Sequence, residues 1–573
     1  MTDTSAVARN FDPIQFSVIR SSLVAVSREM GVTLRQTAYS EIFNEGNDFS
    51  CGLFDAKARL TAQGEFLPIH LGALQYAVRQ AIEELAPLRE FKPGDAIISN
   101  DPYRGGTHLP DLTMVSPIFY DGELVAFAAN RAHHADVGGA VPGSFYSRAK
   151  DNFMEGLRIP PVWLYRAGER QRDVYEFILN NVRVPANMKG DLAAQVSANR
   201  SAALRYQALC ERYGRAAIVS AEERSRADSE ARMRAVIRSW PDGEYFGEDI
   251  MDNDGITDEP ITIRVKVVVN GDALVIDYSD TDPQASGPIN SVPYMTASAT
   301  YLCLQAATDP EIAPNQGCYR PIKIVSREGT VVHPIFPAPC TAGNETSHRI
   351  VNALMAALST MPSGPHVIAG DQGSSNNMLL TCYGKAGMQI LYQYPEGAWG
   401  ATPEKDGESA LFSIVGNCRN MPAEALELKF PVRLKRYELR ADTGGDGKFR
   451  GGLGTRRDYE ILSDVAELSF VADRCKYGAK GFDGGGEGAP GAYLIDRGDG
   501  FQPASPIFAS KGAEIPLKVG DIVSQQTAGG GGWGDPEERC DQRRSQDLEA
   551  GYVTRSKSQE NLTEARLITS HNT

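Results

Sequence analysis

The hydrophobic positions in the first third of the chain change their spacing several times. Between residues 11 and 38 they recur every three or four residues, as on one face of an α-helix, and Asp12 and Pro13 supply an N-cap and a first turn. The run 51–63 then indicates a β-hairpin, and residues 70–85 return to helical spacing. The first third is therefore predicted to mix helices and strands.

The middle of the chain changes to long helical runs. Residues 189–237 are rich in Ala, Arg, Glu and Leu and are predicted to form long helices, with Pro185 interrupting the pattern just before them. Residues 261–279 then alternate apolar and polar positions around the Asn-Gly pair at 270–271. This alternation predicts another hairpin.

Helical spacing returns at residues 292–308 and 348–359, and glycine then becomes dense. Over residues 430–527 short β-patterned runs dominate, which predicts an antiparallel sheet or sandwich. The tail after Pro536 is polar and partly helical, and we expect its end beyond about Ser558 to be disordered.

These patterns together predict a multidomain α+β protein and not a mainly parallel, doubly wound sheet. We expect five segments along the chain. They are a mixed α+β domain with a metal-site hairpin (1–170), a helical arm (171–245), a central α+β domain (246–429), a glycine-rich and β-rich domain (430–536) and a partly disordered tail (537–573).

Composition and charge exclude several classes of function. The chain has 573 residues and a net charge of −15, which argues against nucleic acid as a partner because such binding depends on clustered Lys and Arg. Its N-terminus lacks a signal-peptide pattern, and no segment offers the roughly 18 uncharged apolar residues of a membrane span. Nine scattered cysteines without a CxxC pair fit a reducing compartment. We therefore expect a cytoplasmic protein.

The densest group of chemically active residues lies between Asn100 and Ser144. Asp121-Gly122 separates two apolar runs, which is a strong signal for a hairpin with a type I′ turn. If Tyr120 faces Glu123, regular pairing places Asp111 opposite Ala132. The hairpin thus brings the segment before its first strand alongside the segment after its second strand.

This hairpin predicts a metal site. It places His108 and Asp111 beside His133, His134 and Asp136, and imidazole and carboxylate ligands suit Zn, Mn or Fe. Regular pairing favours His134 on the face of Asp111, but Pro110 disrupts pairing there, so the choice between His133 and His134 stays open. A hydrogen-bonded polar rim at the end of a hairpin is the competing interpretation.

Other motifs that suggest cofactors or nucleophiles lack the required context. There is no GxxxxGK[ST] phosphate loop and no GxSxG elbow, and the GxGxxG at 486–491 precedes a strand-like run instead of a helix. The four glycines at 529–532 fit a close approach to a ligand or a partner backbone, but a flexible exit from the sheet is slightly favoured.

Six motifs in this order resemble the hydantoinase B/oxoprolinase family from about Asp12 to Arg539. The motifs are NDPYRGGTHLPD (100–111), HHADVGG (133–139), EGLRIPP (155–161), GNETSHR (343–349), DTGGDGKFRGGLG (442–454) and GGGGWGDP (529–536). The family includes B-type subunits of ATP-dependent N-methylhydantoin amidohydrolases, the C-terminal half of 5-oxoprolinase, B-type subunits of caprolactamases, and α subunits of acetone and acetophenone carboxylases.

The resemblance implies a hetero-oligomer with a divided function. A hydantoinase A-type subunit with an actin-like ATPase fold binds ATP and activates the substrate by phosphorylation, and the B-type subunit completes the reaction. One divalent metal ion (Zn, Mn or Fe) is held in similar proteins by positions that match His108, Asp111 and His133.

Further site residues follow from that resemblance and from local chemistry. We expect His134 or Asp136 to orient water or move its proton, and Glu41 and Asp48 to line the same pocket as catalytic groups. A second set lies at the start of a predicted helix, where anions bind well. It comprises Asn344, Thr346 and Arg349, which we expect to bind an anionic substrate group or phosphate.

Three functions are compatible with these features. The first is a metal-dependent subunit of an ATP-dependent cyclic amide hydrolase that opens a hydantoin, oxoproline or lactam ring. The second is a subunit of an ATP-dependent carboxylase that acts on acetone or an aryl ketone; the chain is short for an acetone carboxylase α subunit. The third is a non-catalytic structural subunit of such a complex.

Overall fold

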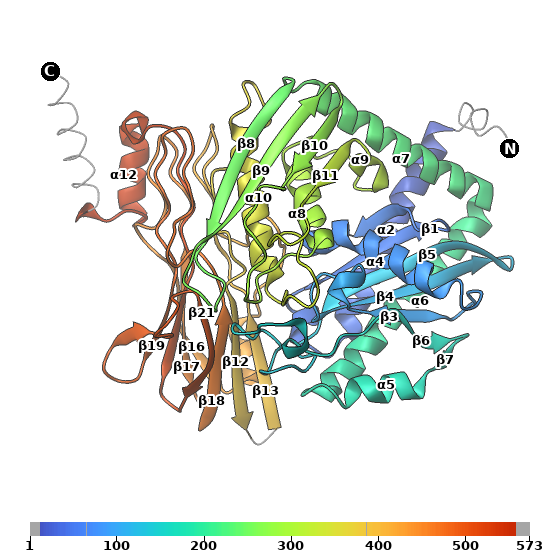
Figure 1. The fold of residues 1–573 in the computed structure, drawn as a ribbon, viewed down its shortest axis with the longest axis horizontal. Helices are drawn as coiled ribbons and strands as arrows, with labels where there is room; N and C mark the ends of the chain where they lie inside the picture. Colours follow the sequence, from blue (N-terminus) through green and yellow to red (C-terminus); the bar gives the residue numbers. More distant parts are fainter. Residues whose placement is uncertain (1–11, 65, 385–386, 557–573) are drawn as a thin grey trace. The chain divides into compact units, whose positions relative to one another are not determined.

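The structure is a computed structural model that describes residues 12–64, 66–384 and 387–556 (Figure 1). Its contacts divide the chain into two units. The first unit comprises Met1–Glu244, Lys266–Ser347 and Val415–Met421, and the second comprises Tyr245–Val265, His348–Ile414 and Pro422–Thr573. Helices occur together with several separate sheets, which confirms the α+β multidomain prediction. The five-segment division stays a prediction, and its disordered tail beyond Ser558 lies outside the described residues.

The first unit is built on a seven-stranded antiparallel sheet with strand order β2-β1-β5-β4-β3-β6-β7. The predicted hairpins at 51–63 and around Asp121 are both confirmed. The strands are β1 (Phe49–Asp55), β2 (Leu60–Gly64), β3 (Ala96–Ser99), β4 (Asp111–Tyr120), β5 (Glu123–His133), β6 (Val162–Arg166) and β7 (Glu169–Arg170).

The β4–β5 hairpin contains an irregularity that the alternating sequence pattern does not reveal. Asp121 and Gly122 both have positive φ, as a type I′ turn requires, and Tyr120 faces Glu123 as predicted. The register then shifts between Ile118 and Phe119, because β5 has one extra residue, Val125. The prediction that Asp111 faces Ala132 is therefore wrong by one residue.

Helices cover both faces of this sheet, and most of them match the predicted helical runs. In α2, Asp12 accepts a hydrogen bond from the backbone N–H of Ile14 and caps the first turn, as expected. Pro185 is the first residue of α6, and the predicted interruption of the helical run separates α5 from α6. The helices of this unit are α2 (Pro13–Thr37), α3 (Glu41–Asn44), α4 (Pro68–Leu85), α5 (Arg172–Leu179), α6 (Pro185–Tyr213), α7 (Arg215–Arg238), α8 (Pro293–Ala306) and α9 (Gln316–Tyr319). The helix α10 (Gly343–Ser359) begins in the first unit and belongs to the second unit from His348 onward.

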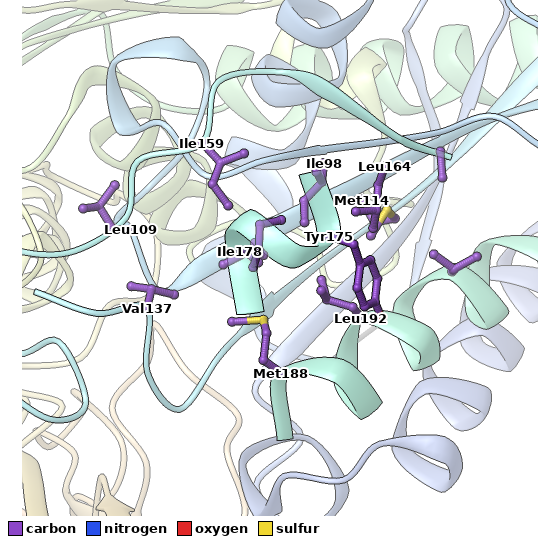
Figure 2. Close-up of a cluster of buried hydrophobic side chains, with 13 residues drawn as sticks. Ile98, Leu109, Met114, Val137, Ile159, Leu164, Tyr175, Ile178, Met188 and Leu192 are labelled. Atoms are coloured by element: carbon purple, nitrogen blue, oxygen red, sulfur yellow. The ribbon is translucent and has the colours of Figure 1, made fainter. Parts of the chain in front are cut away.

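A buried hydrophobic cluster joins the sheet to α5 and α6 (Figure 2). Leu112 and Met114 of β4 pack with Leu192 of α6 and with Ile178 of α5, and all four side chains are fully or almost fully buried. Burial of such side chains contributes about 1.5–3 kcal/mol each. Even-numbered positions of β4 therefore point into this core, and the intervening positions, beginning with Asp111, point to the opposite face.

The second unit holds the antiparallel sheets predicted for the C-terminal region. Their strand orders are β13-β12-β18-β21 and β16-β17-β22-β19-β20, and a two-stranded β14–β15 sheet follows β13 and precedes β16 in sequence. The strands are β12 (Asn377–Gly384), β13 (Gly387–Gln393), β14 (Gly397–Ala398), β15 (Ser409–Leu411), β16 (Val432–Leu439), β17 (Thr455–Ile461), β18 (Val465–Val471), β19 (Ala492–Asp496), β20 (Phe501–Pro503), β21 (Lys511–Leu517) and β22 (Ile522–Gln526), with helices α11 (Ala423–Lys429) and α12 (Asp541–Glu549).

A further sheet has the order β11-β10-β9-β8 and contains the predicted hairpin at 261–279. Its two-residue turn is Gly271-Asp272, one residue later than expected, and β10 pairs with β11 in parallel. The strands are β8 (Gly243–Met251), β9 (Ile261–Asn270), β10 (Ala273–Asp277) and β11 (Ile322–Val325). No helix within the described residues is both long and apolar enough to cross a membrane.

The four glycines at 529–532 form a tightly packed segment, so the favoured interpretation as a flexible exit is wrong. Gly531 donates a backbone hydrogen bond to Gly370, and Gly532 donates one to Gly486. A Cβ atom added to Gly530 would lie 2.1 Å from the carbonyl oxygen of Trp399. Glycine is required here because backbone segments of the second unit approach one another without room for side chains.

Candidate metal centre

The ends of three adjacent strands bring the predicted metal ligands together. Asp111 is the first residue of β4, and it faces His133, the last residue of β5. Asp48 precedes β1, and its carbonyl oxygen accepts the backbone N–H of His133. The Val125 bulge determines this arrangement, because regular pairing would have placed the neighbouring His134 on the face of Asp111.

Two imidazoles and one carboxylate converge at this sheet edge. His108 Nε2 lies 2.8 Å from Asp111 Oδ1, and His133 Nδ1 lies 3.1 Å from the same oxygen and 3.2 Å from His108 Nε2. All three side chains are buried. Ligand atoms about 2.1 Å from one ion lie roughly 3–3.5 Å apart, so this donor set fits a divalent metal.

The orientation of His108 favours metal binding through Nε2. Its Nδ1 lies 2.6 Å from the carbonyl oxygen of Thr341, which only accepts hydrogen bonds, so Nδ1 carries the proton. The lone pair of the neutral ring is then on Nε2, the atom that faces Asp111.

The second oxygen of Asp111 is held by residues that the sequence did not single out. His70, near the start of α4, places Nε2 3.1 Å from Asp111 Oδ2, and the Thr107 hydroxyl donates to that oxygen at 2.5 Å. His70 belongs to the predicted helix 70–85, whose spacing indicated only a structural role. One feature of the sequence could have indicated that His70 lies near Asp111. His70 follows the β1–β2 hairpin closely, and β2 ends at the sheet edge where β5 ends and β4 begins.

The charges at this centre are strongly coupled. Burial raises the pKa of Asp111, but the charges and hydrogen bonds of His108 and His70 hold that pKa well below its usual value. Burial lowers the pKa of His133 to about 4. Burial and the nearby charge of Asp111 raise the pKa of Asp48 well above its ordinary value. Burial lowers the pKa of His108, but the charge and hydrogen bond of Asp111 raise it above its ordinary value. The carboxylate of Asp111 therefore interacts with all three imidazoles, of His70, His108 and His133.

Several buried polar atoms around the triad make no hydrogen bond within the described part of the chain. They include Asp48 Oδ1, His70 Nδ1 and Arg131 Nη1. Arg131 shares a strand face with His133, donates through Nη2 to the Gly105 carbonyl, and interacts electrostatically with Asp111. Buried polar atoms are usually satisfied, so this concentration favours a functional centre over a merely structural polar rim.

Three other predicted catalytic residues have different surroundings. His134 points to the opposite sheet face, where its Nε2 lies 3.1 Å from Gln195 Oε1 on α6. Asp136 accepts hydrogen bonds from the backbone N–H groups of Gly138, Gly143 and Arg183. Glu41 is buried in the first turn of α3.

The three predicted substrate-binding residues begin α10, but they do not form one group. Asn344 is half-buried in the first turn, and the Thr346 hydroxyl donates to the carbonyl oxygen of Ile289. Arg349 is fully buried in the second unit, where it forms ion pairs with Asp249 and Asp473.

Comparisons with known proteins agree over nearly the whole chain. The model of the family described as hydantoinase B/oxoprolinase matches residues 12–536. A Pseudomonas protein, named as the B-type subunit of a putative D-/L-hydantoinase, is 33% identical over 96% of this chain and 94% of its own. The 5-oxoprolinase of Saccharomyces cerevisiae is 30% identical over 92% of this chain but 42% of its own length.

A solved structure supports the same assignment. The crystal structure of ATP-dependent caprolactamase from Pseudomonas jessenii matches with a TM-score of 0.87 and 30% identity, and the match covers 95% of each chain. The motif order in the sequence, the family model and this structural similarity lead to one conclusion. The chain belongs to the hydantoinase B/oxoprolinase family.

Proposed function

We propose that this chain is the metal-dependent B-type subunit of an ATP-dependent hydrolase that opens cyclic amides such as a hydantoin, oxoproline or lactam. The observation that carries the proposal is the buried convergence of His108, Asp111 and His133. Names of similar proteins support the substrate class, because they refer to hydantoinase, 5-oxoprolinase and ATP-dependent caprolactamase.

In this proposal a separate subunit of the hydantoinase A type binds ATP. The sequence contains no GxxxxGK[ST] phosphate loop, and the similar Pseudomonas hydantoinase protein is named as one subunit of a larger enzyme. The yeast 5-oxoprolinase has a large additional part that this chain does not match, which leaves room for the ATPase in that longer protein. The working enzyme would then be a cytoplasmic hetero-oligomer, in agreement with nine scattered cysteines that form no CxxC pair in the sequence.

His108, Asp111 and His133 would hold one Zn, Mn or Fe ion. Such an ion polarises a carbonyl group and lowers the pKa of bound water. The protein's own contribution is orientation: Thr341 fixes the ring of His108, and His70 and Thr107 fix Asp111.

Asp48 is the proposed proton acceptor beside the metal ligands. It lies immediately before β1, where its carbonyl oxygen accepts the backbone N–H of His133, and its Oδ1 has no hydrogen-bond partner within the described residues. Burial and Asp111 raise the pKa of Asp48, and a bound cation would favour its ionised form. In this scheme the Asp48 carboxylate then takes the proton of the attacking water and returns it to the ring nitrogen when the C–N bond breaks.

His134 is engaged by Gln195, and Asp136 by the backbone N–H groups of Gly138, Gly143 and Arg183. The catalytic roles predicted for these two residues and for Glu41 stay predictions.

Asn344 is the predicted substrate-binding residue that this proposal retains, because it lies in the first turn of α10, a favourable place for an anionic group. The hydroxyl of Thr346 and the guanidinium of Arg349 are already engaged by Ile289 and by the carboxylates of the second unit. Their predicted contact with substrate stays a prediction.

Metal analysis together with an assay of the reconstituted complex tests the proposal. After dialysis, we expect about one equivalent of metal in the wild type and a loss of that metal in His108→Ala and Asp111→Ala, with folding checked by circular dichroism. With an A-type ATPase subunit, cyclic amide should stimulate ADP release by the wild type and be opened to the free acid.

The outcomes separate the three candidate functions. Metal content unaffected by both substitutions would contradict the proposed centre and favour a structural subunit. Retained metal dependence with bicarbonate-dependent ketone consumption, and no ring opening of any amide tested, would favour a carboxylase.

A further inference from the structure

Another buried carboxylate, Glu155, lies outside the predicted ligand set and contacts the backbone that precedes α10. Glu155 follows a short 3₁₀ turn, η2 (Asn152–Met154), and its side chain is fully buried. Its Oε1 accepts the backbone N–H of Thr341 at 2.7 Å, and its Oε2 accepts that of Cys340 at 3.0 Å. The Asn152 amide also donates to Oε2, at 2.9 Å.

The hydrogen bonds that the structure describes for Glu155 come from backbone and amide donors, not from a cation. Burying a carboxylate without an opposite charge is expensive unless several donors compensate for the lost hydration. Burial raises the pKa of Glu155 to about 7, and these three donors oppose that rise. The cost of burying Glu155 is explained if its carboxylate holds the backbone at 340–341 in one position.

The backbone that Glu155 holds is the part that orients His108. Thr341 donates its N–H to Glu155, and its carbonyl oxygen lies 2.6 Å from His108 Nδ1. The next residue is held from another side, because the Ala342 N–H donates to the Pro288 carbonyl. Thr341 is therefore fixed on both sides of its carbonyl group.

We propose that Glu155 is a positioning residue of the metal centre: it fixes the backbone at 340–341 so that the Thr341 carbonyl keeps the proton of His108 on Nδ1 and presents Nε2 to the metal. This inference rests on the proposed function, because it assumes that His108 is a ligand. It also assigns a role to the EGLRIPP motif, whose first residue is Glu155.

The chemistry of the three donors explains why a carboxylate is needed. Glutamine has the same shape but offers one acceptor oxygen, so its amide nitrogen would face either the Thr341 N–H or the donors at Oε2. Aspartate keeps two acceptors but is one methylene shorter, which separates it from both backbone groups. Glu155→Gln and Glu155→Asp therefore disturb the same contact in different ways.

The test measures zinc affinity of the full chain by competition with a chromophoric chelator. We expect Glu155→Gln to bind Zn²⁺ about 10–100-fold more weakly than the wild type, as is common when an outer-shell partner is lost. Cys340→Ser is the matched control, because it keeps both backbone donors and a side chain that can hydrogen-bond to Asn152 and Glu155, and its affinity should stay at the wild-type value.

Thermal unfolding of the metal-free and zinc-loaded proteins separates positioning from simple stabilisation. A positioning role reduces the increase in Tm that Zn²⁺ produces, since this increase depends on affinity. A structural role would lower both Tm values equally and leave the affinity unchanged, and this result would overturn the inference. If Glu155→Gln does not fold, Glu155→Asp serves as the test with the same criteria.

His108→Ala distinguishes failure of the inference from failure of the proposed function. If His108→Ala loses Zn²⁺ but Glu155→Gln and Glu155→Asp bind it as the wild type does, only the positioning role is wrong. If His108→Ala itself keeps wild-type affinity, the proposed metal centre is wrong as well.

Discussion

Both units of the molecule bury charged side chains, but the two groups differ in what their charges can do. In the first unit one carboxylate, Asp111, is shared by the imidazoles of His70, His108 and His133. In the second unit carboxylates meet guanidinium groups. The members of that second group, which we call the arginine network, are Asp249, Arg349, Asp473 and Arg474.

The arginine network satisfies its own charges. Arg349 Nε lies 2.9 Å from Asp473 Oδ2, and Arg474 Nη2 lies 2.6 Å from Asp249 Oδ2. Burial raises the pKa of Asp249, but the charges of Arg474 and Arg349 hold it below its usual value. Arginine cannot give up its proton and has no lone pair to offer, and the carboxylate oxygens of Asp249 and Asp473 are already engaged by the guanidinium groups.

The metal centre has the opposite property. Its imidazoles can be neutral, and the lone pairs of His108, His133 and Asp111 point at one another across about 3 Å. Lone pairs that converge in that arrangement, two on imidazoles and one on a carboxylate, gain from a cation, whereas guanidinium–carboxylate pairs are already neutralised. The comparison shows that convergent lone pairs indicate a site and that buried charge alone does not.

The largest expected effect comes from breaking the arginine network. Arg349→Met leaves Asp473 and Asp249 buried without one of their counter-charges, so the free energy of unfolding should fall by about 3–5 kcal/mol. Urea denaturation measures that loss. Metal affinity of the folded fraction should stay unchanged, because the affected contacts belong to the second unit.

Arg433→Met is the matched control for this prediction. Arg433 forms an ion pair with Glu460 in the same unit, but 53% of its side chain is exposed, so the expected loss is under about 1 kcal/mol. Wild-type stability in Arg349→Met would contradict the idea of a self-satisfied network. A higher KM with normal stability would instead support the predicted contact of Arg349 with substrate.

The adjacent histidines of β5 provide the next test. His133→Ala removes a proposed ligand, and metal affinity should fall by at least about 100-fold, or about 2.7 kcal/mol, since loss of a ligand exceeds loss of an outer-shell contact. His134→Ala removes a side chain on the opposite face, and metal affinity should change less than about tenfold. Chelator competition measures both values.

Equal losses in the two variants would contradict the assignment of opposite faces. A larger loss of metal affinity in His134→Ala than in His133→Ala would mean that His134 is the ligand, as regular hairpin pairing favours. Thermal unfolding of the metal-free variants controls for general damage, because His134 also packs edge-on against Phe43.

The sequence predicted most elements of this centre but not their register. The Asp-Gly turn identified the β4–β5 hairpin, and the motif order identified His108, Asp111 and His133. The choice between His133 and His134 depended on the bulge at Val125, which alternation of apolar residues does not encode, because all residues around it are apolar.

Contacts between residues that lie far apart in the sequence could not be predicted either. His70 lies 41 residues before Asp111 (111 − 70), and no local pattern connects them. Arg349 was interpreted from its place at the start of a helix, whereas its counter-charge Asp473 lies 124 residues away. Periodicity predicts which side chains share a face of one element, but it does not predict which elements face each other.

Within the described residues another buried carboxylate, Glu222, has neither a metal-site arrangement nor a direct guanidinium partner, and it gives the smallest expected effect. Glu222 of α7 accepts a hydrogen bond from Tyr206, and burial raises its pKa from an ordinary value of 4.5 to about 8. Between those values the folded state keeps a proton that the unfolded state releases, so stability should fall as pH rises, by about 1.4 kcal/mol per pH unit at most. The negative charge of Glu222 is removed by protonation, and not by a bound metal ion or by an ion pair with arginine.

Glu222→Gln should therefore flatten the pH dependence of stability between about pH 5 and 8, because the amide is neutral throughout and its oxygen still accepts from Tyr206. Urea denaturation at several pH values measures the difference between variant and wild-type slopes. The adjacent Glu223→Gln is the control: burial raises the pKa of Glu223, but Arg59 and Arg226 lower it below 4.5, so its removal leaves the slope above pH 6 unchanged. Parallel curves for Glu222→Gln and the wild type would mean that Glu222 is ionised in the fold and belongs with the arginine network.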